Sequence, residues 1–443
     1  IEQRLTKEEI LELYVNRVFL GHRSYGFETA AQTYYGKTLA ELSLAEHAML
    51  AGVPQAPSRN NPLSNPKRSE VRRNWILGRM LALDMIDETA HQEARSSTDN
   101  ASFNGLKVEV DADYIAEMAR QVAVDRLGSA AYTDGYVVHT TVNGNLQQAA
   151  RDAVIDGLIT YDKRHGWRGP EQQHPPNQDE TPEELKSRWA KALRAMPVIA
   201  DLSPAIVTQL REDGVALMLR DGSDGALSWS NDLRRIRRFV TEDRRSPAVR
   251  SVSDLLQVGD LVRVSQRDEA LKLAQVPRVQ GALVSLDPSD GSIKALVGGM
   301  GFVLSKFNRA IQASRQPGSN FKAFLYAAAL ENGIHPATLI NDAPVVVGNL
   351  TNEDMWRPEN DSGRFYGPTR VREALTFSRN LVSIRVLQQL GVSKLIEMAG
   401  RVGFDVSDMQ PNLTLALGTH AYTPLEIASG YTVIANGGFE VKP

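Results

Sequence analysis

Ser319 and Lys322 place a potential nucleophile three residues before a potential base, inside the segment RQPGSNFKAFLYAAALENG. The part after the proline-glycine pair is apolar and rich in alanine, which predicts a helix. Residues three apart share a helix face, so the lysine amine can approach the serine hydroxyl. A hydroxyl becomes nucleophilic when a base removes its proton, and a partly buried lysine with a lowered pKa is such a base. The pair therefore indicates serine acyl-transfer chemistry.

The four-residue pattern S-x-x-K does not identify a site by itself. Ser64 and Lys67 also match it, but Pro66 lies between them in a polar, proline-rich loop, which argues against a helical base. Serine acyltransferases of this kind carry a second motif of the S-D-N type as well. The surroundings of each motif must therefore decide between the two candidates.

Ser378-Arg379-Asn380 has the S-x-N form of that second motif and lies between the helical patterns REALTF and LVSIRVLQQLG. The same form occurs at residues 58–60 and 102–104, but neither stretch has that context. A polar loop between two helices can present a hydroxyl and an amide to a cleft. The alternative is that Asn380 only caps the second helix.

The region from about Gly281 to Pro443 resembles the transpeptidase domain of class A penicillin-binding proteins, the bifunctional peptidoglycan synthases. The matching phrases are GALVSLDPSDGSIKALVGG, SKFNRAIQASRQPGSNFKAFLYAAAL, MWRPENDSGRFYGPTRVREAL, SRNLVSIRV and LALGTHAYTPLEIASGYTVIANGG. By this resemblance Ser319 is the acylated nucleophile, and its backbone N–H is one of two oxyanion donors. Lys322 is the activating base, and Ser378 relays the proton toward the leaving group. Asn380 binds the amide of the donor peptide or of a β-lactam.

The amino-terminal end resembles a second domain of the same proteins. EQRLTKEEILELYVNRVFLG predicts an amphipathic helix, with apolar residues from Ile10 to Leu20 broadly on one side. With the alanine-rich segment that follows, it resembles the last third of the glycosyltransferase domain. Those domains polymerise lipid II with one carboxylate as general base and a second that orients substrate or metal. Glu12 matches the second carboxylate; the alternative is an ordinary solvated charge.

Two motifs of the family do not occur in this chain. The E-D-x-x-F-x-x-H motif with the principal glycosyltransferase carboxylate is absent, and so is K-T-G or K-S-G, whose strand supplies the second oxyanion donor. We therefore expect an internal fragment, truncated at both ends, or a sequence that omits residues. Such a piece would not polymerise lipid II, and acylation of Ser319 would be weakened, since one oxyanion donor is worth about 10²–10³-fold in rate.

The organisation predicted from the sequence is a multidomain α+β fold. The last domain is expected to be β-lactamase-like, a sheet flanked by helices, whose first hairpin pairs Ala282–Leu286 with Ile293–Val297. The predicted regions are a helical glycosyltransferase remnant at 1–85, a linker region at 86–196, a small OB-like β-barrel at 197–279, and an incomplete transpeptidase domain at 280–443.

The barrel is predicted from short alternating strands with turn signals at Asp213-Gly214 and Asp221-Gly222. In the 1A type of class A penicillin-binding proteins, an oligonucleotide-binding-like (OB) barrel occupies this position. The basic run at Arg234–Arg238 suggests nucleic acid, but single-strand binders combine basic grooves with stacking aromatics, which are sparse here. A docking surface for a partner protein is the preferred interpretation.

Composition excludes several other classes. An apolar share of 42% supports packed cores, and a formal charge of −3 gives no basic footprint for nucleic acid. The absence of cysteine rules out disulfides, thiolate catalysis and zinc-thiolate sites. No apolar run approaches the length of a membrane span, and the sequence as given is not expected to contain a signal peptide. The family's membrane anchor is expected in the parent protein, before the part that resembles this chain.

The sequence does not predict a metal site. His165, Glu171 and His174 are close in sequence, but their spacing matches no helical or hairpin ligand pattern. Transpeptidation by Ser319 requires no cofactor. The complete glycosyltransferase domain commonly works with a divalent metal such as magnesium, so magnesium is expected only in the full-length protein.

The resemblance thus implies a peptidoglycan synthase at the periplasmic face of the bacterial inner membrane. Its substrates are lipid II and stem peptides, which it polymerises and cross-links, and β-lactams acylate the same serine. One alternative is a hydrolase, a DD-carboxypeptidase or β-lactamase, although β-lactamases are single compact domains. The other is a non-catalytic scaffold fragment, which the intact set of Ser319, Lys322, Ser378 and Asn380 argues against.

Overall fold

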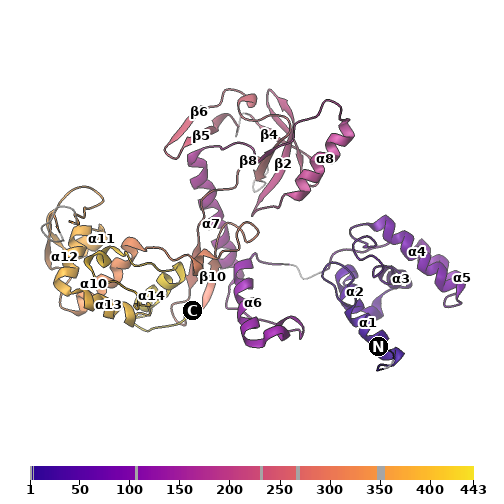
Figure 1. Cartoon of the computed structure of the whole chain (residues 1–443), viewed down its shortest axis with the longest axis horizontal. Helices are drawn as coiled ribbons and strands as arrows, with labels where there is room; N and C mark the ends of the chain where they lie inside the picture. Colours follow the sequence, from indigo (N-terminus) through magenta and orange to yellow (C-terminus); the bar gives the residue numbers. More distant parts are fainter. Residues whose placement is uncertain (1, 3, 105–107, 230–232, 266–269, 347–354) are drawn as a thin grey trace. The chain divides into compact units, whose positions relative to one another are not determined.

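The chain forms two compact units, Ile1–Glu109 and Val110–Pro443, and each is described by itself. Figure 1 shows the first in indigo and purple and the second from purple to yellow. The structure is a computed structural model that describes all residues except 1, 3, 105–107, 230–232, 266–269 and 347–354.

The first unit consists of helices around a small apolar core. Leu20 and Tyr34 are fully buried in it, and Leu50 is 1% exposed. The tyrosine hydroxyl donates to the Leu20 carbonyl oxygen at 2.6 Å, which ties the chain after the first helix to the second. The helices of this unit are α1 (Lys7–Arg17), α2 (Phe27–Tyr35), α3 (Leu44–Gly52), α4 (Pro66–Ala82) and α5 (Glu88–Ser96).

Helix α1 forms where the sequence predicts a helix, but its apolar side is not covered. Thr6 and Glu9 make a capping box at its start, which favours helix initiation. Leu13 and Tyr14 are 46% and 50% exposed, and α1 has no buried residue in the described part of the unit. The predicted helix is confirmed as far as Arg17, but Val18 and Leu20, expected on its apolar side, lie beyond its end, and Leu20 is buried in the core.

The residues after 85, expected to begin a linker region, belong to the first unit as far as Glu109. Arg73 of α4 is 1% exposed and donates to the carbonyl oxygens of Ser97 at 2.9 Å and Arg95 at 3.1 Å. Tyr35 donates to the Asp99 carboxylate at 3.0 Å. These contacts fix the segment after α5 on the unit, because a buried guanidinium needs hydrogen-bond acceptors.

The second unit contains a long helix, α7 (Gly144–His165), that packs against the hairpin of β9 (Leu283–Leu286) and β10 (Ile293–Val297). The hairpin is antiparallel, so its predicted pairing is confirmed. Gln147 of α7 holds the strand through both main-chain groups of Leu296: its amide nitrogen donates to the carbonyl oxygen at 3.1 Å, and its amide oxygen accepts from the N–H at 2.9 Å.

The strand-rich region of this unit also matches the prediction of short strands. In the described residues, six strands form one antiparallel sheet in the order β1-β7-β2-β3-β4, with β8 paired to β7. A separate ribbon pairs β5 (Arg237–Thr241) with β6 (Arg244–Ala248). The sheet strands are β1 (Gln172–Gln173), β2 (Leu202–Arg211), β3 (Gly214–Leu219), β4 (Asp224–Ser228), β7 (Asp260–Ser265) and β8 (Lys272–Ala274).

This region begins earlier in the chain than residue 197. Gln172 and Gln173 pair with β7 at the edge of the sheet. Helix α8 (Pro182–Ala195) packs on the sheet through Trp189 and Leu193, which meet buried apolar side chains of β2, β3 and β7. Much of the segment 86–196 is therefore built into the two units instead of forming a linker.

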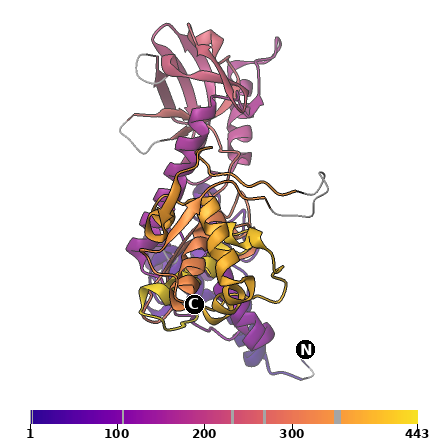
Figure 2. The ribbon, with the colours of Figure 1, turned by 90° about the vertical axis from the view of Figure 1, so that its left-hand side faces the viewer.

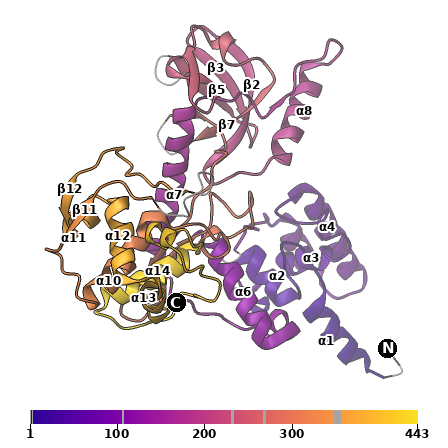
Figure 3. The same cartoon turned by 60° about the vertical axis from the view of Figure 1, so that its left-hand side comes forward.

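The helical region after the hairpin holds the largest apolar core of the second unit. Its central helices, α10 (Lys322–Glu331) and α12 (Asn380–Leu390), contribute fully buried residues such as Phe324 and Leu381. Figure 2 shows these orange and yellow helices gathered together, and Figure 3 shows the two-stranded sheet of β11 and β12 beside α11 and α12. The other elements here are α9 (Arg309–Gln312), β11 (Leu339–Asp342), β12 (Gly367–Arg370), α11 (Val371–Thr376), α13 (Val392–Arg401) and α14 (Pro424–Ala435). Helix α6 (Asp113–Leu127) precedes α7 in the chain and packs against β10 through Tyr114 and Ile115.

Candidate functional site

Ser319 lies in a short 3-10 turn, Gly318–Phe321, that runs directly into α10. The turn is held from two sides. Gly318 N–H donates to the Gly418 carbonyl oxygen at 3.2 Å, and Tyr431 of α14 donates to the Asn320 carbonyl oxygen at 2.8 Å. Gly418 has φ +68°, and a Cβ atom there would collide with the Gly318 carbonyl oxygen, so only glycine allows this approach.

Lys322 begins α10 and is 1% exposed, although its side chain is a cation. Its Nζ atom donates to the carbonyl oxygen of Ser378 at 2.9 Å, to the hydroxyl of Ser378 at 3.0 Å and to Oδ1 of Asn380 at 2.7 Å. Burial lowers the pKa of Lys322 to about 8, because desolvation disfavours the ammonium form. With this pKa, about a tenth of the Lys322 amine is neutral at pH 7.

Ser378 connects the lysine to the nucleophile. Its Oγ atom lies 3.0 Å from Ser319 Oγ and donates to it, while it accepts from Lys322. Among the described contacts there is no direct hydrogen bond between Lys322 and Ser319, which corrects the simple expectation from their spacing. The lysine instead reaches Ser319 through the second serine.

The backbone at Ser378 is in an unusual conformation. Its φ of +51° lies in the left-handed region, which costs a residue with a Cβ atom about 1–2 kcal/mol. The loop that imposes it is tied by main-chain hydrogen bonds from Ser378 N–H to Leu375 and from Arg379 N–H to Ala374. Such strain is typical of functional sites, where the surrounding structure maintains it.

Asn380 is the first residue of α12, and its side chain does not cap that helix. Its Oδ1 atom accepts from Lys322, and its Nδ2 atom donates to the Glu359 carbonyl oxygen at 2.9 Å. The helix is capped from a distant loop: Asn360 Oδ1 accepts from the N–H groups of Asn380 at 2.9 Å and Leu381 at 3.3 Å. The capping alternative for Asn380 is therefore wrong, and sequence reasoning missed Asn360.

The four predicted residues thus form one hydrogen-bonded group. The Ser319 and Ser378 side chains are exposed, so a substrate from solution can reach them, while Lys322 is covered. Among the described residues the N–H of Ser319 has no hydrogen-bond acceptor. It is therefore free to donate to the oxyanion that forms when a carbonyl is attacked. A hydroxyl, a bridging hydroxyl, a desolvated amine and an amide in this order can perform acyl transfer.

Glu12 stands on the exposed surface of α1. No described residue forms an ion pair or hydrogen bond with its side chain. Within the described ranges, no group of three or more His, Asp or Glu side chains could hold a metal ion. Glu12 is therefore not part of a metal-binding group among the described residues.

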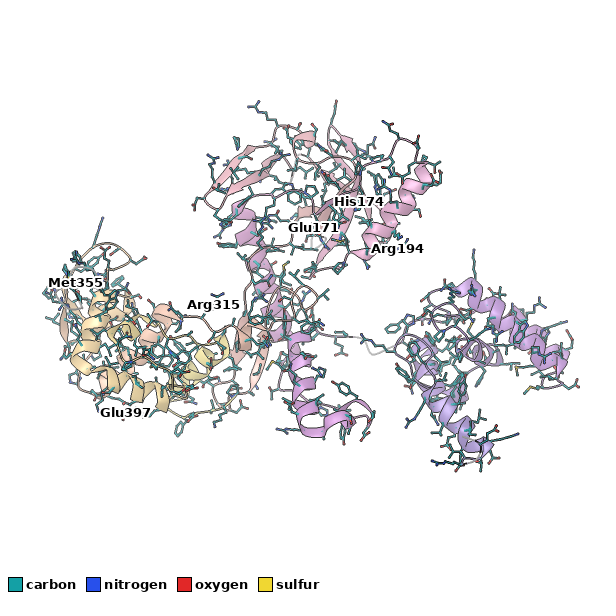
Figure 4. All side chains as sticks on the ribbon, in the orientation of Figure 1. Glu171, His174, Arg194, Arg315, Met355 and Glu397 are labelled. Carbon is teal, nitrogen blue, oxygen red and sulfur yellow. The ribbon has the colours of Figure 1, made fainter. Side chains whose placement is uncertain are left out.

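The cluster of His165, Glu171 and His174 is used in other ways. Glu171 binds the buried Arg263 with both oxygens, at 2.9 and 3.0 Å, and His174 pairs with Gln172 at 3.0 Å. Figure 4 shows Glu171 and His174 beside the sheet near α8. His165 contacts the Tyr161 carbonyl oxygen within α7.

A second candidate surface lies beside the ribbon of β5 and β6. A cavity of about 350 Å³ there is lined by Arg235, Arg237 and Arg245 together with Trp167 and the carboxyl end of α7. Within the described residues, none of these three arginines forms an ion pair. The Trp167 indole N–H is buried and has no acceptor in this part of the chain.

The part of the chain that the structure describes has no helix with the length and apolarity required to cross a membrane.

Three family models match the chain in succession. Residues 1–81 match the model "Transglycosylase", residues 167–279 match "Penicillin-binding protein OB-like domain", and residues 281–443 match "Penicillin binding protein transpeptidase domain". The described helical unit, the strand-rich region and the helical region with Ser319 correspond to these matches. The multidomain α+β fold predicted from the sequence is thus confirmed.

Curated relatives agree along the whole chain. Penicillin-binding protein 1A of Pseudomonas aeruginosa is 51% identical over 100% of this chain and 53% of its own length. That of Escherichia coli is 42% identical over 100% of this chain and 52% of its own length. The chain thus spans about half the length of the curated relatives that it matches.

A solved structure is similar as well. The crystal structure of penicillin-binding protein 1A from Haemophilus influenzae superposes with a TM-score of 0.84 at 40% identity, covering 99% of this chain and 63% of that one. The three domain models match in the same order along the chain, and the curated relatives align with all of it. Both findings point to the same family. The chain belongs to the class A penicillin-binding proteins of the 1A type.

Proposed function

We propose that this chain carries the acylation site of a peptidoglycan DD-transpeptidase, with Ser319 as its nucleophile. The observation that carries the proposal is the hydrogen-bonded series Ser319–Ser378–Lys322–Asn380. It joins a hydroxyl to a lysine whose pKa of about 8 allows it to accept a proton. The matched transpeptidase domain contains all four residues.

In the proposed reaction, Ser319 Oγ attacks the carbonyl carbon of the penultimate D-alanine of a stem peptide. Its proton passes through the Ser378 hydroxyl to the neutral Lys322 amine, and the Ser319 N–H stabilises the oxyanion. The peptide bond to the terminal D-alanine then breaks, and the leaving amine takes a proton back along the same path. Asn380, held by Lys322, offers its amide to the donor peptide. An amine of a second stem peptide then attacks the ester and releases the serine.

The same chemistry explains β-lactams as ligands. A β-lactam carbonyl acylates Ser319, and its ring opens without a group leaving the site. A DD-carboxypeptidase or β-lactamase would use the same residues with water as acceptor. The transglycosylase and OB-like matches in the same chain favour a synthase over both. The hydrogen-bonded arrangement of Ser319, Ser378, Lys322 and Asn380 argues against a non-catalytic scaffold.

For the full-length protein we propose lipid II polymerisation in addition, at the periplasmic face of the inner membrane. Glu12 is proposed as the second carboxylate of that activity, and its exposed position on α1 leaves it accessible to a substrate. A membrane anchor and magnesium belong to this proposal for the full-length protein. Replacing Glu12 by glutamine there should abolish glycan polymerisation without affecting penicillin binding. Normal polymerisation would remove Glu12 from the site.

We also propose that the OB-like region docks a protein that presents acidic side chains, and no nucleic acid. The support is the cavity beside Arg235, Arg237 and Arg245, which have no carboxylate partner among the described residues. An oligo-glutamate peptide can serve as the probe in a fluorescence anisotropy titration. Charge reversal of the three arginines should abolish its binding, whereas Arg194→Glu on α8 (Figure 4) should not. Equal binding by both variants would refute the surface.

The acylation site is tested by the intact mass of the full-length protein after incubation with benzylpenicillin. The wild type should gain one drug mass on the peptide that contains Ser319, and Ser319→Ala should gain none. Ser64→Ala is the matched control, because Ser64 belongs to the other S-x-x-K sequence, and it should be labelled like the wild type. A label elsewhere, or none on the wild type, would overturn the proposal.

The fate of the acyl-enzyme separates transfer from hydrolysis. With a thioester donor and a D-amino acid acceptor, a transpeptidase forms the exchanged product faster than the free acid. Predominant hydrolysis at saturating acceptor would favour the carboxypeptidase alternative.

A further inference from the structure

Asn360 and Asp342 form a buried pair directly behind the loop that carries Ser378 and Asn380. Asn360 is 5% exposed, and Asp342, the last residue of β11, is fully buried. The amide Nδ2 of Asn360 lies 2.8 and 3.0 Å from the two carboxylate oxygens of Asp342, and it also donates to the Arg364 carbonyl oxygen at 2.9 Å. Among the described hydrogen bonds, neither side chain contacts Ser319, Lys322 or Ser378.

The carboxylate determines which way the asparagine side chain points. An ionised carboxylate only accepts hydrogen bonds, so Asp342 requires the Nδ2 side of the amide. Leaving a buried carboxylate without a donor is costly, and Asn360 is the side chain that supplies one among the described residues. The opposite end of the amide, Oδ1, is therefore directed toward α12.

At that end Asn360 fixes the beginning of α12. Its Oδ1 atom accepts from the N–H groups of Asn380 and Leu381, which have no partner within the helix. Asn380 is also held at its side chain by the neighbouring Glu359 carbonyl oxygen. The consecutive residues Glu359 and Asn360 thus accept hydrogen bonds from the side chain and the main chain of Asn380, respectively.

These hydrogen bonds to Asn380 also restrain Ser378, the strained residue two positions earlier. Ser378 keeps φ +51° only while the chain on either side is restrained, since that conformation is unfavourable by itself. On the amino-terminal side the restraint is the turn of α11, and on the carboxyl-terminal side it is Asn380 bound to Asn360. A shift of Asn380 would displace its Oδ1 from Lys322 and move the Ser378 hydroxyl away from Ser319.

We propose that Asp342 and Asn360 are positioning residues, which hold the Ser378–Asn380 loop in the geometry that acylation requires. The inference rests on the proposed acylation of Ser319 and adds the pair on which its geometry depends. Misplacement of reacting groups by about 1 Å costs roughly 10²-fold in rate. Loss of the pair should therefore lower the acylation rate constant while changing the binding constant of benzylpenicillin much less.

The test is an amide–carboxylate exchange in the full-length protein. Asn360→Asp places two acceptor-only groups 2.8 Å apart and should lower acylation roughly 10–100-fold. Asp342→Asn keeps an oxygen for the Asn360 amide and should be milder. The double variant, Asn360→Asp with Asp342→Asn, restores a donor facing an acceptor. It should recover most of the lost rate, because a carboxylate at position 360 still accepts from the N–H groups of α12.

The control is Asn332→Ala, which removes an amide hydrogen bond to Ala328 at the opposite end of α10 from Lys322. It should lower the melting temperature without altering the acylation rate constant of the folded protein. Where Asn360→Asp folds, rescue by the exchange separates positioning from stability. Where it does not fold, the milder Asp342→Asn takes its place and should show a lowered acylation rate constant in its folded state. The inference would be overturned if Asn360→Asp acylated with the rate constant of the wild type. It would also be overturned if the double variant folded but its acylation rate constant stayed as low as that of Asn360→Asp. An unlabelled wild type would instead overturn the proposed function.

Discussion

The Nζ atom of Lys322 lies 2.7 Å from Oδ1 of Asn380, so the base and the substrate-binding amide of the proposed site are joined before any substrate arrives. The same nitrogen contacts the Ser378 hydroxyl at 3.0 Å. One buried amine therefore organises both residues of the second motif. Its charge and its position are expected to dominate the chemistry of Ser319.

Ser378→Ala should separate the base from the nucleophile. The hydroxyl is the atom that bridges Ser319 and Lys322, and no described contact replaces it. Since a proton relay of this kind contributes about 10²–10⁴-fold, acylation by benzylpenicillin should slow by that order while the drug still binds. Ser407→Ala, an exposed serine in the same region, is the control and should acylate normally. Rapid acylation of Ser378→Ala would show that Lys322 reaches Ser319 directly.

The acylation rate should rise with pH and level off above about 8. Burial lowers the pKa of Lys322 to about that value, and only the neutral amine can accept the proton of Ser319. Below the pKa, the neutral fraction and hence the rate should increase about tenfold per pH unit. Stopped-flow acylation across this range measures the profile, and Lys394→Met on α13 should leave it unchanged. A rate that is independent of pH would exclude Lys322 as the base.

Gly418→Ala should damage the serine turn more than a positive φ alone explains. A Cβ atom at Gly418 would meet the Gly318 carbonyl oxygen, whereas Gly333 also has a positive φ, +83°, but no atom near its missing Cβ. Gly333→Ala therefore measures the backbone cost, about 1–2 kcal/mol. The free energy of unfolding of Gly418→Ala should fall further, and its acylation should be slower. Equal losses in both variants would mean that the turn adapts.

The sequence indicated the candidate site residues, but not the residues that hold them in place. Ser319 and Lys322 were singled out by residue type and spacing on one predicted helical turn. The roles of Ser378 and Asn380 followed only from the resemblance to class A penicillin-binding proteins, since the S-x-N pattern occurs three times in the sequence. Asn360 and Gly418 were not predicted, since each acts through space on a segment about 20 to 100 residues away. The resemblance gave Ser378 as a proton relay toward the leaving group, but its position between Ser319 and Lys322 was not predicted, because spacing on one helix says nothing of a side chain that comes from another segment.

The fold was predictable where pairing or periodicity is local. The β9–β10 hairpin follows from alternation around a turn, and the predicted pairing of its two strands was confirmed. The boundaries at residues 85 and 196 depend on long-range contacts, such as Arg73 with Ser97 and Gln172 with Leu261. Polar, proline-rich sequences carry no local sign of such contacts.

Glu171→Gln should destabilise the OB-like region, although Glu171 lies far from Ser319 in the sequence. Its carboxylate binds Arg263 with two hydrogen bonds, and Arg263 is 1% exposed inside the sheet. Removing one partner leaves a buried guanidinium charge without compensation, which costs about 3 kcal/mol. The exposed pair of Arg401 and Glu331 is the matched control, because solvent screens it, and Glu331→Gln should cost about 1 kcal/mol or less. Thermal unfolding of the whole chain compares the two variants. A loss in Glu171→Gln no larger than in Glu331→Gln would mean that the main-chain oxygens of Pro197 and Leu202, which also accept from Arg263, suffice to hold the charge.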